Sequence, residues 1–138
     1  MPYRFAIVAS AYNSLIMDRL IAGAQRALKD HEPVSLIRVP GSFEIPLAAK
    51  SAALSKKYDG IVALGCVLRG ETPHFEYISS AVSNGLSQAA LETGIPIGFG
   101  VLTVDTVEQA MERSGESGNK GFEAATAALE MINVLRQI

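Results

Sequence analysis

The sequence has one cysteine, no long apolar run and no block of like charge. Its single cysteine, Cys66, cannot form an internal disulfide, which fits a reducing compartment, so we expect a cytoplasmic protein with Cys66 largely buried. No apolar stretch approaches the roughly 20 residues of a membrane-spanning helix. A net charge of −2 without a basic block argues against nucleic acid or anionic lipid as a partner.

The composition is apolar for a chain of 138 residues. Hydrophobic residues make up 49% and charged residues 19%, which excludes disorder and favours self-association. The length is typical of one domain, so residues 1–138 are expected to fold as a single domain. The last helical pattern supports association independently, because its apolar residues cover more than one face. These residues are Ala124, Ala125, Ala127, Ala128, Met131, Ile132 and Leu135.

Short apolar runs alternate with segments of helical periodicity along the chain. The runs predict strands at residues 5–10, 34–39, 60–67 and 95–103. The first predicted helix runs from a cap at Asn13 or Ser14 to about Leu28, the second from Pro46 to about Lys57, and the third from Pro73 to near Gly94. The fourth runs from a cap at Asp105 or Thr106 to Arg113, and the last from Phe122 to Arg136. This order implies an open, mainly parallel four-stranded sheet with helices on both faces, the flavodoxin-like three-layer α/β/α class.

Ligands of such sheets bind beyond the carboxyl ends of the strands, so four segments are candidates for a binding site. They are residues 11–13, 41–44, 67–74 and the stretch from Thr103 onward. The third overlaps Gly65–Thr72, which matches a phosphate-binding P-loop except that Glu71 replaces the lysine. Because that lysine holds the outer phosphates of a nucleoside triphosphate, a carboxylate there excludes an NTPase.

The rest of this turn still suits a single phosphate group. Gly70 frees the backbone, Thr72 is a natural helix cap, and Pro73 suits the first helical position, so the next amides would point outward. A capped helix without any ligand is an equally good interpretation of the turn alone.

His74 is expected in the first turn of the helix that follows. The positive end of the helix dipole favours the neutral imidazole there, which can take up a proton and return it. An isolated histidine is more often structural, and that is our interpretation of His31 between Asp30 and Glu32. His74 differs because it lies at the carboxyl end of a strand, beside a turn whose backbone amides could bind an anion.

Several other residues allow a functional and an ordinary interpretation. Tyr12 and Phe43 would either pack in the core or stack on a flat ring. Glu44 would either line the site or stabilise the start of a helix by interacting with the positive end of its dipole. Arg113 and Lys120 are surface cations by default, but either would complete a phosphate site. No clustered His, Cys or acidic residues suggest a metal.

Five segments resemble motifs of the lumazine synthase family, in the order in which that family has them. They are "VPGSFEIPLAAK" (39–50), "YDGIVALGCVLRGETPHFEY" (58–77), "TGIPIGFGVLT" (93–103), "EQAMERSG" (108–115) and "GNKGFEAATAALEM" (118–131). The resemblance implies condensation of 5-amino-6-(D-ribitylamino)uracil with 3,4-dihydroxy-2-butanone 4-phosphate to 6,7-dimethyl-8-ribityllumazine, the penultimate step of riboflavin biosynthesis. It implies neither a cofactor nor a metal.

The resemblance also implies roles for individual residues. Contacts to the aminouracil would come from Tyr12, Ser42, Phe43, Glu44, Cys66, Val67, Leu68 and, from a neighbouring subunit, Phe99. The phosphate would be bound by Glu71, Thr72 and Arg113, with help from Lys120, and His74 would transfer protons. The family's assembly implies a homopentamer with its active site between subunits, and it leaves open whether the pentamers build an icosahedral shell.

Two features depart from the family pattern. Ala11 and Tyr12 stand where the family often has Arg followed by Phe or Trp, and the loop "SGESGNKG" is slightly shorter than in shell-forming members. Two alternatives to the enzyme therefore stay open: a non-catalytic paralogue that binds a lumazine or flavin, and a structural shell protein.

Overall fold

The computed structural model describes residues 2–70 and 73–138. Its strands are β1 (Phe5–Ser10), β2 (Ser35–Val39), β3 (Gly60–Leu68) and β4 (Ile97–Val104). Its α-helices are α1 (Ser14–Ala27), α2 (Ile45–Leu54), α3 (Phe75–Thr93), α4 (Val107–Glu112) and α5 (Lys120–Arg136), and short 3₁₀ turns occupy Lys29–His31 and Ser42–Glu44. The predicted alternation of strands and helices is confirmed.

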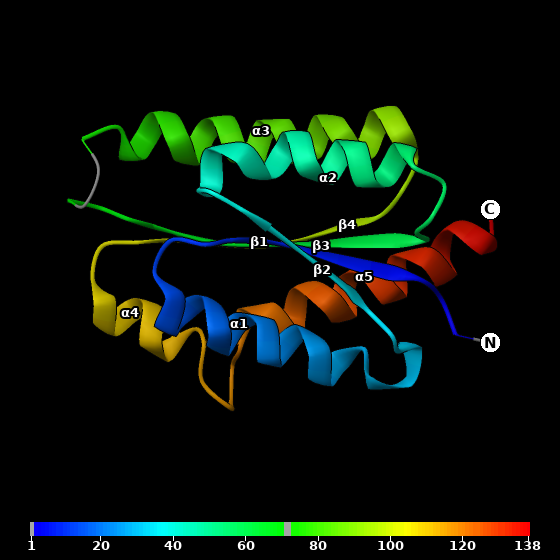
Figure 1. Ribbon diagram of the computed structural model, residues 1–138, viewed down its shortest axis with the longest axis horizontal. Helices are drawn as coiled ribbons and strands as arrows, with labels where there is room; N and C mark the ends of the chain where they lie inside the picture. The colour runs from blue at the N-terminus through cyan, green and yellow to red at the C-terminus, as the bar shows by residue number, and fades with distance from the viewer. Residues whose placement is uncertain (1, 71–72) are drawn as a thin grey trace.

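The strands form one parallel sheet in the order β2-β1-β3-β4. Figure 1 shows α2 and α3 covering one face and α1, α4 and α5 the other, which confirms the predicted three-layer class. The chain leaves β1 toward β2 on one side and returns to β3 on the other, so the order reverses between β1 and β3. Ligands of open α/β sheets bind at the carboxyl side of such a reversal.

The two central strands are buried along their whole length, as their unbroken apolar runs predict. Successive side chains point to opposite faces. Val62 and Leu64 therefore join the cluster beneath α1 and α5, whereas Ile61 and Ala63 join the cluster beneath α2 and α3. Each fully buried Val, Ile or Leu side chain stabilises the fold by about 1.5–3 kcal/mol.

Glycines in β4 allow α5 to pack directly against the strand. A Cβ atom at Gly98 would overlap the carbonyl oxygen of Ala124, and one at Gly100 would lie 3.1 Å from the Cβ atom of Ala124. Side chains at these positions would push α5 away. This close packing brings the first residues of α5 alongside β4.

Some predicted helix ends are confirmed. Thr106 caps α4 by accepting a hydrogen bond from the Gln109 amide at 3.1 Å, and Gly94 ends α3 with a left-handed φ of 73°. α2 ends earlier than predicted, before Lys56, whose φ of 65° is left-handed. α5 begins earlier than predicted, at Lys120, because the Asn119 side chain accepts from the Phe122 amide at 3.0 Å.

Asn13 is the N-cap residue of α1, so the predicted start of this helix is confirmed, but the predicted start of α3 is wrong. Asn13 makes no side-chain capping bond at α1, since its φ of 61° is left-handed and a capping residue needs an extended backbone. Pro73 does not open α3, because the first helical hydrogen bond runs from the Ile78 amide to the His74 carbonyl. His74 is therefore the N-cap residue and does not lie within the first turn. The predicted cap Thr72 lies outside the described residues.

Candidate active site in two hollows

A cavity of about 340 Å³ opens at the carboxyl ends of β1, β2 and β3, and we call it the β1–β3 hollow. It is lined by Tyr12, Gly41, Ser42, Phe43, Glu44, Cys66, Val67, Leu68 and Ile78. It therefore contains seven of the eight residues that the family motifs assign to the aminouracil. Ile78, one helical turn after His74, was not predicted.

Backbone geometry explains why these residues converge. Ala11 donates its N–H to the carbonyl of Val39 at 2.8 Å, which joins the segments that follow β1 and β2. A Cβ atom at Gly65 would lie 2.9 Å from Ser42 Oγ, so the missing side chain lets the Ser42–Glu44 turn pack onto β3. These two contacts hold three strand ends together.

The aromatic side chains of this hollow face solvent. Phe43 is 62% exposed and Tyr12 is 51% exposed. A large ring normally buries most of its area in a folded protein, so two rings left open beside one cavity suit stacking on a flat ligand. Of their two interpretations from the sequence, packing in the core is wrong for this chain. Cys66 is buried, as predicted.

The turn after β3 leads to His74, the residue before α3. Gly70 has a φ of 91°, which confirms that the turn needs its conformational freedom. Glu71 and Thr72 lie outside the described residues. The ring of His74 lies 6.2 Å from that of Tyr77, measured between centroids, and His74 itself does not line the hollow.

An ion-pair cluster stands immediately before this turn. Arg69 donates from Nε to Asp105 at 2.7 Å and from Nη1 to Glu76 at 3.0 Å. The hydrogen bond to Asp105, followed by the one to Glu76, raises the pKa of the Arg69 guanidinium. This cluster could not be predicted from the sequence, because it depends on Asp105, which lies 36 residues from Arg69 along the chain.

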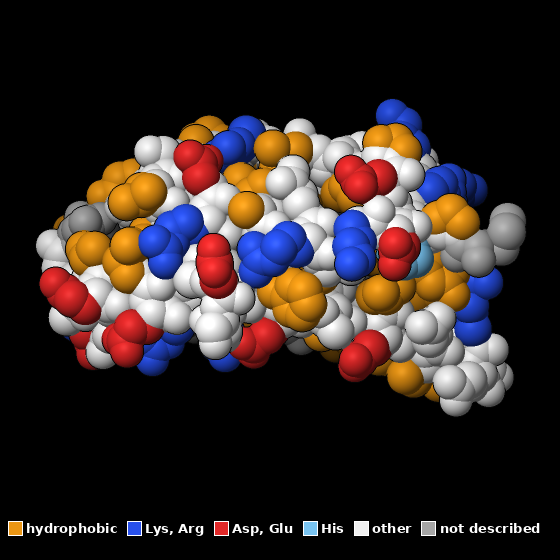
Figure 2. Space-filling model, turned by 90° about the horizontal axis from the view of Figure 1, so that it is seen from below, with side chains coloured by type: hydrophobic (Ala, Val, Ile, Leu, Met, Phe, Trp, Pro, Cys, Tyr) orange, Lys and Arg blue, Asp and Glu red, His pale blue; other side chains and the backbone are white. Residues whose placement is uncertain are grey.

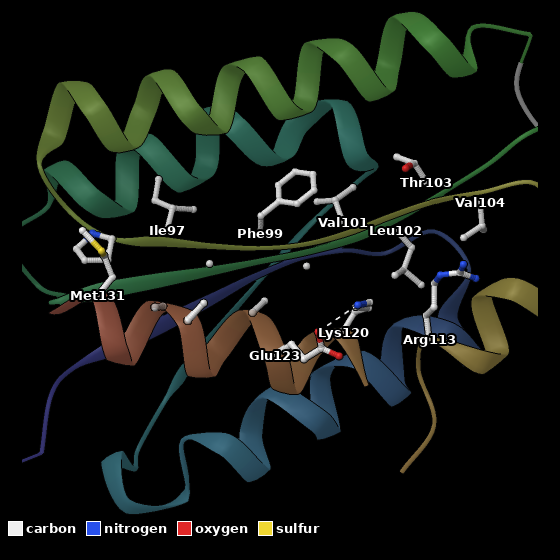
Figure 3. Close-up of a pocket in the computed structure, with 16 residues that line it drawn as sticks. Ile97, Phe99, Val101, Leu102, Thr103, Val104, Arg113, Lys120, Glu123 and Met131 are labelled. Carbon is white, nitrogen blue, oxygen red and sulfur yellow. Dashed lines mark hydrogen bonds and ion pairs between the residues drawn. The ribbon is translucent and has the colours of Figure 1, made fainter. Parts of the chain in front are cut away.

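A second and larger cavity, of about 740 Å³, runs between β4 and α5, and we call it the β4–α5 hollow. Figure 3 shows Phe99 on the α3 side of β4, Lys120 on α5, and Arg113 beside the carboxyl end of β4. Lys120 pairs with Glu123 at 3.1 Å, and Phe99 is 50% exposed. An aromatic ring and two cations therefore share this hollow.

The loop between α4 and α5 fixes the backbone of Arg113 relative to that of Lys120. The Lys120 amide donates to the Arg113 carbonyl at 2.8 Å. Asn119, only 3% exposed, donates to the carbonyls of Ser114 and Gly115 at 3.0 and 2.9 Å, and to that of Arg19 at 3.1 Å. Sequence reasoning missed Asn119, although an Asn directly before a helical pattern is a capping signal.

Within one chain the predicted site is thus divided. The residues assigned to the aminouracil gather in the β1–β3 hollow, except Phe99, which lies in the β4–α5 hollow with Arg113 and Lys120. No residue lines both hollows among those described. The segments 11–13, 41–44 and 67–74 supply the β1–β3 hollow, and the segment from Thr103 onward supplies the β4–α5 hollow, although Asp105 and Arg69 connect that segment to the end of β3.

Charged side chains of both signs are mixed on the lower face of the molecule (Figure 2). Figure 2 shows Lys and Arg interspersed with Asp and Glu over the face formed by α1, α4 and α5, with no field of one sign. Among the described residues, no group of three or more His, Cys, Asp or Glu has the spacing to hold a metal ion. In the same residues, every helix is too short or too polar to cross a bilayer.

Comparison with known proteins places this geometry in context. The sequence profile of the 6,7-dimethyl-8-ribityllumazine synthase family matches residues 2–136. A 6,7-dimethyl-8-ribityllumazine synthase from Nitratidesulfovibrio vulgaris (strain DP4) is 55% identical, with 98% of this chain and 90% of the relative aligned. One from Syntrophus aciditrophicus (strain SB) is 50% identical, with 98% and 91% aligned. The chain belongs to the 6,7-dimethyl-8-ribityllumazine synthase family.

Proposed function

We propose that the protein condenses 5-amino-6-(D-ribitylamino)uracil with 3,4-dihydroxy-2-butanone 4-phosphate to form 6,7-dimethyl-8-ribityllumazine, phosphate and water, the penultimate step of riboflavin biosynthesis. The observation that carries this proposal is the family match over residues 2–136. The two hollows support it, because the reaction needs a place for a flat ring and a place for one phosphate.

The β1–β3 hollow is the aminouracil site in this proposal. The exposed rings of Tyr12 and Phe43 stack on the pyrimidine, while Ser42 and Glu44 contact its polar groups. Cys66, Val67 and Leu68 contribute mainly backbone contacts at the end of β3. Tyr12 keeps a stacking face where the family often has Phe or Trp.

Arg113 is the main phosphate ligand, and Lys120 assists it. A guanidinium can grip a phosphate with two parallel hydrogen bonds, whereas an ammonium acts as a point charge. The hydrogen bond between the Lys120 amide and the Arg113 carbonyl keeps the two cations near each other. Glu71 and Thr72 complete the phosphate site through their backbone amides and the threonine hydroxyl, a role that rests on the family motif alone.

His74 is the proton-transfer residue. The amine attacks the ketone with loss of water, phosphate then leaves, and ring closure releases a second water, so protons must be taken up and returned at several steps. No step of this condensation changes an oxidation state of the protein, and none requires a cofactor or a metal ion. Holding the two substrates in place contributes more than His74, since orientation saves roughly 7–11 kcal/mol and acid–base assistance gives about 10²–10⁴-fold.

The active site is completed between two copies of the chain. The β4–α5 hollow of one subunit supplies Phe99, Arg113 and Lys120 to the β1–β3 hollow of its neighbour. This arrangement explains why one chain separates the ring site from the cations. β4 lies at an edge of the sheet and α5 leaves Met131 and Leu135 about 40% exposed, so this face has apolar surface to bury.

The proposed assembly, which rests on the family resemblance, is a homopentamer of single-domain subunits in the cytoplasm. Light scattering of the purified protein distinguishes a pentamer from a monomer and from an icosahedral shell of pentamers. A monomer that forms lumazine at the full rate would contradict the shared site.

The test of the activity is direct. The purified protein is mixed with both substrates, and lumazine fluorescence and released phosphate are followed against the spontaneous reaction. Product above the spontaneous rate is expected, and its absence would reject the enzyme. Ring binding without turnover would instead support the non-catalytic paralogue, and assembly without ring binding would support the shell protein.

A further inference from the structure

Arg69, at the carboxyl end of the strands, makes four contacts although its side chain is about half exposed. Besides the bonds to Asp105 and Glu76, its guanidinium carbon lies 4.4 Å from the centre of the Phe75 ring. Its backbone N–H donates to the carbonyl of Val104 at 2.8 Å. One residue therefore joins the end of β3, the first turn of α3 and the loop that follows β4.

These contacts lie on both sides of the turn that carries His74. Arg69 directly precedes Gly70, and Phe75 and Glu76 directly follow His74. The carbonyl of His74 accepts a hydrogen bond from the amide of Ile78 at 2.9 Å, and Ile78 lines the β1–β3 hollow. The position of the first turn of α3 therefore determines where His74 lies relative to this hollow.

Arg69 is poorly suited to bind the phosphate itself. Its single positive charge faces two carboxylates, those of Asp105 and Glu76, so the cluster has a net charge of −1. An added anion would compete with both carboxylates for the same N–H groups. Arg69 also lines neither hollow, in contrast to Arg113.

We propose that Arg69 is a positioning residue for proton transfer by His74, acting through Glu76, Phe75 and Asp105 without touching the substrate. The planar guanidinium can bind two carboxylates in fixed directions and stack on a ring at once, which a lysine ammonium cannot do. This role rests on the proposed function, and it adds a residue that the family motifs do not assign to either substrate.

The first experiment tests the positioning without any turnover. Hydrogen exchange at the Ile78 amide and the NMR signals of the His74 ring are compared in wild type, Arg69→Gln and Arg4→Gln. Arg4 is a matched control, because it forms an exposed ion pair with Asp59 at the opposite end of the sheet. In Arg69→Gln we expect faster exchange at Ile78, shifted His74 signals and an unchanged Leu86 amide. Unchanged Ile78 and His74 signals would overturn the proposal.

The second experiment uses kinetics. Arg69→Gln should lower kcat by about tenfold, within the range that a displaced catalytic group produces, and change the KM for the aminouracil less than about twofold. Arg69→Lys should recover part of the rate, and Arg4→Gln should keep it. In a His74→Ala background, Arg69→Gln should lower kcat little further, because both residues act on the same step.

Two results separate the possible failures. If Arg69→Gln lowers kcat by the same factor in the wild-type and His74→Ala backgrounds, Arg69 acts independently of His74, and the proposal is overturned. A wild-type protein that forms no lumazine would reject the proposed function, and the positioning of His74 would then stand or fall by the exchange measurement.

Discussion

The two ends of the sheet carry similar ion pairs with different consequences. At the amino end, Arg4 binds Asp59 at 3.2 Å, and at the carboxyl end Arg69 binds Asp105 at 2.7 Å. All four side chains are partly exposed, and pairs of this kind typically contribute 0.2–1 kcal/mol each. On stability alone the two pairs would be interchangeable.

The difference lies in what each pair connects. The amide of Asp59 already donates to the carbonyl of Arg4 at 2.7 Å, so the amino-end ion pair repeats a backbone contact. The carboxyl-end cluster instead joins α3 to the loop after β4 across the turn with His74. An ion pair that adds little stability can still determine the position of a reacting group.

The two histidines show the same contrast. At the amino end, His31 accepts the Tyr3 N–H through Nδ1 at 2.8 Å and stacks on the Tyr3 ring at 5.6 Å, which confirms its structural interpretation. His74 lies at the carboxyl end, where its carbonyl begins α3. The first end is thus expected to determine stability and the second to determine activity.

The largest effect is expected at the proposed phosphate ligand. Arg113→Ala should raise the KM for the phosphorylated ketone on the order of 100-fold, because a lost charge-assisted contact costs about 2–5 kcal/mol. The KM for the aminouracil should change little. Arg38→Ala is the control, since Arg38 pairs with Asp18 and lines neither hollow. An equal rise in both KM values would reject the assigned role.

The two histidines should separate activity from stability. His74→Ala should lower kcat by about 100-fold, the lower end of the usual contribution of acid–base catalysis, and leave measurable turnover from substrate positioning. His31→Ala should lower the Tm and leave kcat near that of wild type. Steady-state kinetics and thermal unfolding of both variants are the measurements. An unchanged rate in His74→Ala would remove it from the mechanism.

A smaller effect, on stability, is expected at Asn119. Asn119→Ala removes a buried donor from the carbonyls of Arg19, Ser114 and Gly115, which should cost about 1–3 kcal/mol in urea unfolding. Asn133→Ala is the matched control, because Asn133 is exposed and accepts from the Tyr3 hydroxyl at 2.7 Å. Equal losses in the two variants would contradict the role of Asn119 as the anchor of its loop.

The smallest effect concerns the amino-end pair and depends on pH. Burial raises the pKa of Asp59, but hydrogen bonds from Arg4 and the charges of Arg4 and Arg136 outweigh it, so the pKa lies below 3.8. The stabilisation is therefore complete above that value and is lost as the pH falls through the lower folded pKa. Asp59→Asn should cost about 0.5–1 kcal/mol at pH 7.

Unfolding of wild type and Asp59→Asn across acid pH checks this sign. The difference in free energy of unfolding between them should shrink as the pH falls below 3.8. A difference that stays constant, or that grows toward acid, would show that Asp59 is not held ionised by Arg4.

Local patterns predicted much of the fold because their physics is local. The apolar runs of β1 and β3 reflect burial on both faces, and Thr106 and Gly94 mark helix ends through their own backbone and side-chain preferences. Asn13 occupies the predicted N-cap position but makes no side-chain capping bond, since its left-handed backbone depends on the turn from β1 into α1. The family motifs, in turn, named the residues of the β1–β3 hollow.

The amino-acid order alone specified a parallel α/β sheet, the strand ends that carry polar and aromatic residues, and the family, because these follow from periodicity and from contiguous motifs. Folding in three dimensions decided that Arg113 and Lys120 lie in a different hollow from Tyr12 and Phe43. It also paired Arg69 with Asp105, 36 residues away. Contacts between distant segments depend on how helices pack on the sheet, and no local pattern encodes them.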